Sequence, residues 1–443
     1  MSSPSIFNSK PVFASALIIL SFLSAPANAQ NRTTEQGEAQ ITDPNQECSP
    51  YYYAPVSDAL SNYPTIWQPA TIVANDSAAQ AKYQSIIGQI PNIAPKGTQP
   101  ASLMGDFSGY NYPASDPDCW WTDTTCTTPK LAGLPPDVTT VPEPDTLGYG
   151  FDDGPNCSHN AFYDYLQQNN QKATMFYIGS NVMDWPLEAQ RGLADGHELC
   201  VHTWSHHYMT SLTNEQAFAE FYYTVSTRVN LLQAIKLVAG VTPTCWRPPF
   251  GDVDDRIRAF ANAFGLRTVV WQYDSNDWRE GTDGYTAAEV DANYQALIAN
   301  AQNGTFSTAG TIMLTHELNN FTMSEAIKFY DQLKAAFKYL VPVGVGLNQT
   351  QPYVETNYSL PSFSQYVSGT TTVSGGSAAS SASSSSAQAA PSNAGQSSST
   401  GGGSGSDQKT TGGSIGVPSA FVGAGVLTAA AIFASNAMEL LAL

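Results

Sequence analysis

The feature that most constrains the fold of this chain is an alternation of short apolar runs with stretches of helical period, from about Thr146 to Val345. Strands that alternate with helices predict a parallel sheet with its crossover helices packed on the outside. A closed or nearly closed barrel fits better than an open doubly wound sheet, because no glycine-rich phosphate turn follows the first strand.

The alternation defines the individual elements. The expected strands are Thr146–Gly150, Thr174–Ile178, Glu198–His202, Thr244–Arg247, Arg267–Gln272, Thr311–Thr315 and Val341–Val345. The expected helices are Asn160–Gln168, Asn214–Val238, Asp254–Phe264, Ala287–Ala301 and Met323–Tyr339. In a barrel of this kind the active residues lie at the carboxyl ends of the strands.

The barrel is expected to occupy residues 141–345, with an extension on each side of it. Residues 30–140 are rich in Pro, Tyr and Asp without a strong period, which predicts an irregular N-terminal extension packed on the barrel. Residues 346–373 form a shorter C-terminal extension.

The N-terminus has the pattern of a secretory signal at residues 1–29. Lys10 precedes the apolar run Val12–Leu23, and Ala27-Asn28-Ala29 forms a small-x-small cleavage site. A signal anchor is the alternative, although the run is short for a membrane span. Acceptor sites for N-glycosylation support secretion, and they stand at Asn31, Asn75, Asn156, Asn303, Asn320, Asn348 and Asn357.

The C-terminus combines a polar segment with an apolar one. Residues 374–414 are rich in Ser, Gly and Ala and are expected to form a disordered stalk. Residues 415–443 are apolar without a following basic flank, which is typical of a glycosylphosphatidylinositol (GPI) attachment signal that is removed. The attachment residue is expected within 404–406, and a true membrane helix is the alternative. These ends predict a secreted protein anchored to the outer face of the plasma membrane or the cell wall.

Composition excludes one class of partner and favours another. Asp and Glu outnumber Lys and Arg by 37 to 18, so the formal net charge of −19 disfavours binding to nucleic acid. The 22 Tyr and 8 Trp residues suit a surface on which sugars stack. Six cysteines are compatible with three disulfides in an oxidising compartment. We expect a monomer.

Two polar clusters follow the first and third expected strands. Asp152 and Asp153 are adjacent carboxylates in an Asp-Asp-Gly-Pro sequence, which is also a common polar turn. His202 and His206 are four residues apart, so on a helical turn they would lie on one side and could share a divalent metal. A structural role for both histidines is the alternative.

Three further clusters end later strands. They are Trp246-Arg247-Pro248-Pro249-Phe250-Gly251, Asp274-Ser275-Asn276-Asp277-Trp278 and Leu314-Thr315-His316. Each has an ordinary explanation by itself, as a proline turn, a polar loop or a single histidine. Five polar clusters at strand ends of one barrel are better explained as parts of one active site.

In this order the five clusters resemble the motifs of the polysaccharide deacetylases, the family-4 carbohydrate esterases with a NodB homology domain. The resemblance covers roughly residues 140–345. Together with Asn156-Cys157-Ser158, the signal, the stalk and the anchor, the chain resembles the fungal chitin deacetylases of this family. The resemblance implies a distorted barrel of seven or eight (β/α) units and one divalent ion, Zn²⁺ or Co²⁺.

The resemblance also implies a role for each site residue. Asp153, His202 and His206 would be the metal ligands, Asp152 the general base and His316 the general acid. Arg247 would restrain Asp152, and Asp277 would orient His316 and raise its pKa. The remaining implied residues contact substrate: the Phe250 N–H group at the oxyanion, and Leu314 and Trp278 around the acetyl methyl group.

The cysteines allow 15 pairings. Cys119 and Cys126 are close in the sequence and suit a local bridge. The resemblance to the fungal enzymes implies a Cys48–Cys245 bridge, which leaves Cys157 with Cys200.

The expected function is metal-dependent hydrolysis of the N-acetyl groups of chitin, a polymer of N-acetylglucosamine, to give chitosan and acetate at the fungal cell surface. One alternative is a deacetylase of another acetylated polysaccharide or of chitosan oligomers. A second alternative, from a different class, is an inactive wall-binding protein on the same scaffold.

Overall fold

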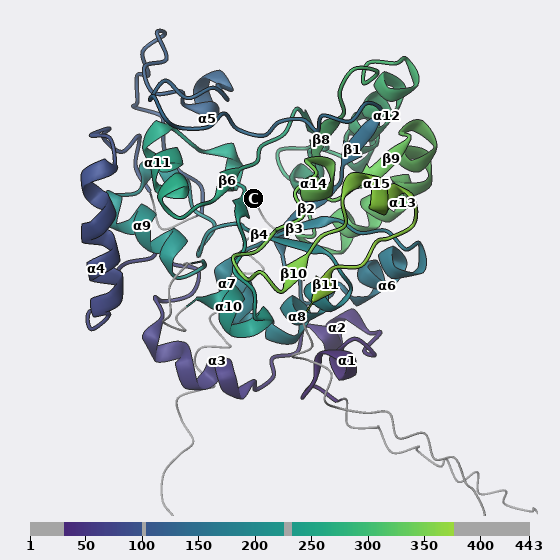
Figure 1. The fold of residues 1–443 in the computed structure, drawn as a ribbon, viewed down its shortest axis with the longest axis horizontal. Coiled ribbons are helices and arrows are strands. Elements are labelled where there is room, and N and C mark those ends of the chain that lie inside the picture. The colour runs from purple at the N-terminus through teal and green to yellow at the C-terminus, as the bar shows by residue number, and fades with distance from the viewer. Residues whose placement is uncertain (1–30, 100–102, 226–232, 376–443) are drawn as a thin grey trace, which may run out of the picture.

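The computed structural model describes residues 31–99, 103–225 and 233–375 (Figure 1). The expected signal, nearly all of the stalk, the attachment residue and the apolar tail lie outside these residues.

Two parallel sheets form the centre of the molecule. The first has the strand order β7-β8-β1-β9 and the second the order β2-β3-β4-β5-β6. The strands are β1 (Thr146–Gly148), β2 (Gly150–Gly154), β3 (Thr174–Tyr177), β4 (Glu198–Val201), β5 (Cys245–Trp246), β6 (Arg267–Thr268), β7 (Tyr273–Asp274), β8 (Thr311–Leu314) and β9 (Tyr339–Val341).

Two continuous segments join the sheets into a distorted barrel. Residues 146–154 form β1 in the first sheet and then β2 in the second, and residues 267–274 form β6 and then β7. A parallel bridge between Asp152 and His316 connects the ends of β2 and β8. The ring of strands is thereby closed on both sides, which confirms the predicted α/β barrel.

Helices cover the outside of the barrel. They include α6 (Asn160–Gln168), α7 (Gly179–Asp184), α8 (Pro186–Ala194), α9 (Asn214–Tyr222), α10 (Ala234–Ala239), α11 (Asp255–Ala263), α12 (Ala287–Gln302) and α13 (Asn320–Ala336). Helix α6 has the predicted bounds. The pair α7 and α8 was not predicted, because the short turn at Trp185-Pro186 interrupts the helical period.

Four predicted elements differ from the structure. The strand expected over Thr146–Gly150 is divided between β1 and β2, and the strand expected over Arg267–Gln272 ends with β6 at Thr268, before β7. The single helix expected over Asn214–Val238 is replaced by α9 and α10, because Gln233 takes an extended backbone and starts a new helix. The strand expected over Val341–Val345 ends at Val341, and Pro342 leads into the short helix α14 (Val343–Gly346). Proline fixes φ near the helical value and lacks an N–H group for the sheet, so it favours this switch.

The barrel interior is filled by side chains from neighbouring strands. Phe176 of β3, Cys200 of β4, Val269 after β6 and Ile312 of β8 belong to one buried cluster. Because these residues come from strands around the ring and still contact one another, they face inward. The polar side chains at the strand ends therefore stand above an apolar floor.

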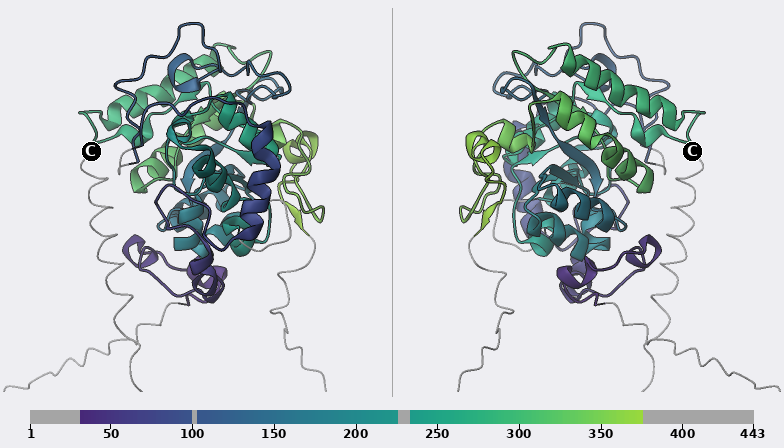
Figure 2. Two further views of the ribbon diagram at one scale, coloured as in Figure 1. Left: turned by 90° about the vertical axis from the view of Figure 1, so that its left-hand side faces the viewer. Right: turned by 90° about the vertical axis from the view of Figure 1, so that its right-hand side faces the viewer.

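The extensions pack on the outside of the barrel. The short helices α1 (Glu35–Glu38), α2 (Pro44–Glu47), α3 (Ala54–Ala59), α4 (Ser77–Ile86) and α5 (Trp121–Thr124) lie around it (Figures 1 and 2). Helix α1 contacts α8, α3 contacts α10, and α4 contacts α9. After the barrel, β10 (Tyr358–Ser359), α15 (Phe363–Val367) and β11 (Ser374–Gly375) complete the described chain.

Three disulfides are present, and only one has the expected partners. Cys119–Cys126 is confirmed, whereas the other bridges are Cys48–Cys157 and Cys200–Cys245. Strands β4 and β5 are parallel neighbours, and this pairing brings the Cα atoms of Cys200 and Cys245 to 5.0 Å. The Cys48–Cys245 and Cys157–Cys200 pairings are therefore wrong, because strand neighbours determine which cysteines meet.

Candidate active site

The carboxyl ends of the strands bring seven of the predicted site residues together. They are Asp152 and Asp153 of β2, His202 and His206 after β4, Arg247 after β5, Asp277 after β7 and His316 after β8. They lie at or after the ends of five strands, β2, β4, β5, β7 and β8, as expected for a parallel barrel.

One carboxylate and two imidazoles converge in a possible metal site. The Asp153 Oδ1 atom lies 3.3 Å from His202 Nε2 and 3.0 Å from His206 Nε2. This Oδ1 atom is buried, and no conventional hydrogen bond reaches it from the described residues. Two imidazole nitrogens and one carboxylate oxygen within 4.8 Å of one another are a donor set that suits zinc and similar divalent ions.

Electrostatics favour the protonation states that bind metal. Burial would raise the pKa of Asp153, but the neighbouring His206 and His202 hold it well below its usual range. Burial lowers the pKa of His206, which favours the neutral imidazole although Asp153 opposes the shift. A carboxylate and neutral imidazoles are the forms that bind a divalent ion.

The two histidines do not lie on a helical turn, contrary to the prediction. The chain after β4 is irregular, and Thr203 and His206 have positive φ values of 65° and 56°. The backbone of Asp153 is also in the left-handed region, with φ of 73°. Backbone strain of this kind persists only where surrounding contacts impose it, and here it aims the two imidazoles at one point.

A buried glutamate that the sequence analysis missed fixes the loop between the histidines. Glu220 of α9 accepts hydrogen bonds from the backbone N–H groups of Trp204 and Ser205, both at 2.9 Å, and from Ser205 Oγ at 2.6 Å. The available signal was a glutamate between the apolar residues Ala219 and Phe221 on an otherwise buried helix.

Asp152 is held by a buried arginine. Arg247 is fully buried, and its Nη1 atom donates to Asp152 Oδ1 at 2.6 Å. Its guanidinium carbon lies 4.1 Å from the centre of the Phe176 ring, above the apolar floor. The other carboxylate oxygen, Asp152 Oδ2, lies 3.7 Å from His202 Nε2, so it faces the candidate metal site.

The Arg247 backbone also positions a candidate metal ligand, His202. Its carbonyl oxygen lies 2.8 Å from His202 Nδ1, which directs the other ring nitrogen of His202 toward Asp153. One residue thus holds both the carboxylate and the imidazole.

His316 and Asp277 form a second charged pair. Asp277 belongs to the short 3₁₀ helix Asp277–Arg279, and its Oδ1 atom lies 2.6 Å from His316 Nδ1. Its Oδ2 atom accepts the His316 backbone N–H at 3.0 Å. Burial would lower the pKa of His316, but Asp277, helped by Asp153 and Asp152, raises it to about 10. The carboxylate of Asp277 therefore favours the protonated form of the His316 imidazole.

The three predicted substrate contacts are spread more widely. Phe250 has a left-handed backbone, and its ring lies edge-on to His206 with centroids 4.7 Å apart. Leu314 is buried at the end of β8, two residues before His316. Trp278 is 38% exposed beside Asp277, so its indole faces solvent.

A second missed residue lies directly after His316. Glu317 is fully buried, its Oε2 atom accepts a hydrogen bond from Tyr163 at 2.8 Å, and its backbone N–H donates to the Asp152 carbonyl. A Cβ at Gly154 would stand 1.7 Å from Glu317 Oε1, so only glycine fits there. Burial raises the pKa of Glu317 to about 8, and the side chain packs beneath the turn that carries Asp152.

We expect the predicted glycosylation site at Asn156 to remain unmodified. Its amide nitrogen donates to the Leu318 carbonyl at 2.6 Å, and its Oδ1 atom accepts from the Ser158 N–H at 2.9 Å. A glycan would replace the amide hydrogen and fill space beside the site. Glycopeptide mapping should find Asn156 bare, with Asn303 at the exposed end of α12 as the comparison site. High occupancy at Asn156 in active enzyme would contradict this expectation.

Sequence comparisons relate this chain to known proteins. Residues 140–269 match the family model described as polysaccharide deacetylase. A protein of Cryptococcus neoformans var. grubii called chitin deacetylase 2 is 53% identical over 344 residues, covering 76% of this chain and 73% of that protein. The chitin deacetylase of Amylomyces rouxii is 45% identical over 339 residues, covering 74% of this chain and 76% of that protein.

One solved structure also aligns with part of this chain. The chitin deacetylase from Colletotrichum lindemuthianum aligns with 21% sequence identity and a TM-score of 0.44, covering 50% of this chain and 96% of that one.

Proposed function

The chain belongs to the polysaccharide deacetylase family, and from this premise we propose that it hydrolyses the N-acetyl groups of chitin to give chitosan and acetate. The observation that carries the proposal is the arrangement of two charged pairs, Arg247–Asp152 and Asp277–His316, around one cluster of possible metal ligands. An amide hydrolase needs a base for water and an acid for the leaving nitrogen, and the two pairs supply them.

We propose that Asp153, His202 and His206 hold one divalent ion, with zinc or cobalt as the candidates. The buried and unsatisfied Asp153 oxygen and the mixed nitrogen and oxygen donors support this assignment. When bound, such an ion would lower the pKa of water and polarise the amide carbonyl.

The chain's own residues would carry the proton transfers. The Asp152 carboxylate, held by Arg247, would accept a proton from the attacking water as its oxygen bonds to the carbonyl carbon. The Phe250 N–H group would donate to the developing oxyanion. The His316 imidazolium would then donate its proton to the glucosamine nitrogen as the C–N bond breaks, releasing acetate.

The acetyl methyl group needs an apolar wall beside the reacting carbon. Leu314 is buried at the end of β8 and Trp278 stands at the rim, so we assign these two side chains to that wall. Trp278 is 38% exposed, so part of its indole is accessible to substrate.

Acetate release from N-acetylglucosamine oligomers, measured with and without a chelator, tests the proposed function. We expect release from chitin oligomers that stops when the metal is removed. Release only from other acetylated polysaccharides would replace chitin as the substrate. Binding of chitin without release from any acetylated polymer would instead favour a wall-binding protein.

Removal of the metal tests the ligand assignment separately. His202→Ala is expected to lose most of the bound metal and at least about 100-fold in activity, because one of three ligands and its tie to Arg247 are lost together. Elemental analysis and metal titration measure the first effect. Full activity in a sample shown to be free of metal would contradict the assignment.

We propose further that the mature protein is secreted and held at the outer face of the plasma membrane by a GPI anchor. This rests on the sequence of residues 1–29 and 374–443. Within the described ranges, no helix has both the length and the apolarity of a membrane span.

Phospholipase treatment tests the anchor. Phosphatidylinositol-specific phospholipase C should release active enzyme from membranes, and a chain truncated before Ile415 should be secreted with an unchanged rate on short oligomers. Peptides from residues 430–443 in the mature surface protein would show that the tail is retained, in favour of a membrane helix.

A further inference from the structure

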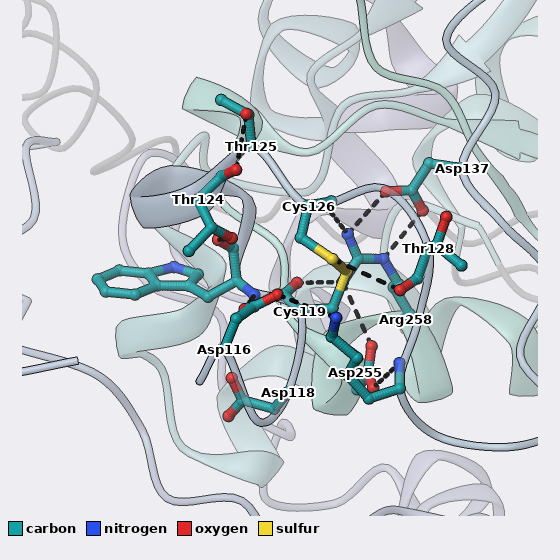
Figure 3. Close-up of a disulfide and its surroundings, with 12 residues drawn as sticks. Asp116, Asp118, Cys119, Thr124, Thr125, Cys126, Thr128, Asp137, Asp255 and Arg258 are labelled. Carbon is teal, nitrogen blue, oxygen red and sulfur yellow. Dashed lines mark hydrogen bonds and ion pairs between the residues drawn. A yellow bond between two sulfur atoms is a disulfide. The ribbon is translucent and has the colours of Figure 1, made fainter. Parts of the chain in front are cut away.

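A short segment of the N-terminal extension is held rigidly beside the barrel. The Cys119–Cys126 disulfide closes it, and the buried side chain of Arg258 from α11 donates to the carbonyl oxygens of both cysteines. Arg258 also forms two hydrogen bonds to Asp137, at 2.9 and 2.7 Å, as Figure 3 shows. A buried guanidinium that is bonded on several sides fixes the segment and leaves it little freedom to move.

This rigid segment places Trp121 against the turn of Phe250. The backbone N–H group of Trp121 donates to the Val253 carbonyl at 3.0 Å, which ties the start of α5 to that turn. The six-membered part of the indole lies on Gly251, where a Cβ would stand 2.2 Å from Trp121 Cζ3. Gly251 has φ of 70° and directly follows Phe250, so glycine is required both by the backbone and by the indole.

A second indole joins Trp121 to the catalytic residues. The ring centroids of Trp121 and Trp271 are 4.8 Å apart in an edge-to-face contact. Trp271 packs on the apolar cluster inside the barrel, two residues after Val269, so it points inward at the carboxyl end. Its ring centre lies 5.8 Å from the guanidinium carbon of Arg247, which holds Asp152.

The two indoles differ from the tryptophans of the core. Trp120, Trp204 and Trp246 are at most 3% exposed, whereas Trp121 and Trp271 are both half-buried. Partly exposed indoles that are fixed in place offer flat apolar faces without a large loss of side-chain entropy on binding. The apolar C–H face of a pyranose ring matches such a surface.

We propose that Trp121 and Trp271 form a sugar-stacking subsite beside the catalytic residues, which takes a pyranose ring of the chitin chain next to the reacting one. The inference rests on the proposed function and extends it, because it makes the N-terminal extension part of the substrate site. Trp121 is then a specificity-determining residue that increases affinity for oligomers and takes no part in proton transfer.

Two substitutions at Trp121 separate stacking from packing. Trp121→Phe keeps a flat ring on Gly251, whereas Trp121→Leu keeps apolar bulk and removes the flat face. We expect Trp121→Leu to raise KM for a chitin hexamer roughly tenfold with kcat nearly unchanged. Trp121→Phe should keep KM within about threefold of the wild-type value. Tyr52→Leu, at an aromatic side chain 71% exposed elsewhere on the extension, should leave KM unchanged.

The outcomes distinguish this inference from the function on which it rests. Wild-type protein that releases no acetate from any chitin oligomer would overturn the proposed function. If the wild-type protein is active and Trp121→Leu and Trp121→Phe both have the wild-type KM for the hexamer, the subsite is overturned and the proposed function is not. A fall in kcat at unchanged KM would also overturn it, because it would show that Trp121 only supports the turn of Phe250. Trp121→Met gives a second test of the flat face if Leu disturbs folding.

Discussion

Asp152→Asn is expected to reduce kcat for acetate release by on the order of 100-fold or more while the metal stays bound. The amide of asparagine keeps the size of the side chain and one oxygen that can accept from Arg247, but it cannot accept a proton from water. The ligand cluster of Asp153, His202 and His206 is unchanged by this substitution. Catalysis should therefore be lost without loss of metal.

Paired measurements of activity and metal content decide between the two adjacent carboxylates. Asp153→Asn should lose metal and activity together, in contrast to Asp152→Asn. Asp283→Asn provides a matched control, because Asp283 is exposed and its left-handed backbone tolerates asparagine. Loss of metal from Asp152→Asn would show that the roles of base and ligand have been assigned the wrong way round.

The sequence predicted the parts of the site that depend on strand order. Asp152, His202, Arg247 and His316 were each placed at a strand end, and a parallel barrel brings all strand ends to one face. This inference needs only the order of the elements. It does not need their exact bounds, which explains why the site was found although the strand expected over 341–345 was wrong.

Features that depend on contacts between distant segments were not predictable in this way. The Cys200–Cys245 bridge depends on the pairing of β4 with β5, and Glu220 reaches the histidine loop from α9. Spacing of His202 and His206 by four residues suggested a helical turn, but the left-handed residues Thr203 and His206 bring the rings together by another route. The spacing of residues in a motif identifies the possible ligands. It does not determine the backbone conformation that brings them together.

Asp277→Asn is expected to lower kcat by roughly 100-fold at neutral pH and to move the alkaline limb of the pH profile to lower pH. In the native protein burial would lower the pKa of His316, but Asp277, helped by Asp153 and Asp152, raises it to about 10, so the proposed general acid would stay protonated up to that range. Without this carboxylate, burial lowers the pKa, and the imidazole loses its proton at a lower pH.

The direction of the pH dependence follows from the protonation state in which His316 would act. Donation to the leaving nitrogen needs the imidazolium, so activity is present below the pKa of His316 and is lost as the pH rises through it. The same raised pKa stabilises the folded state fully below the unfolded value of about 6.5, and this contribution falls as the pH rises toward 10. Both effects should shrink in Asp277→Asn.

Profiles of kcat/KM against pH for the native protein and Asp277→Asn test this role. The ratio of native to variant activity should rise from pH 6 to pH 9, because His316 loses its proton at a lower pH in the variant than in the native protein. Asp277→Glu keeps the negative charge and should retain the native position of the alkaline limb, even if its longer side chain reduces the rate. A uniform loss of activity across the pH range, with the limb unmoved, would show that Asp277 only holds the His316 backbone N–H and the loop around it. A limb that moves in Asn and stays in Glu can arise only from the charge of the carboxylate acting on the His316 ring.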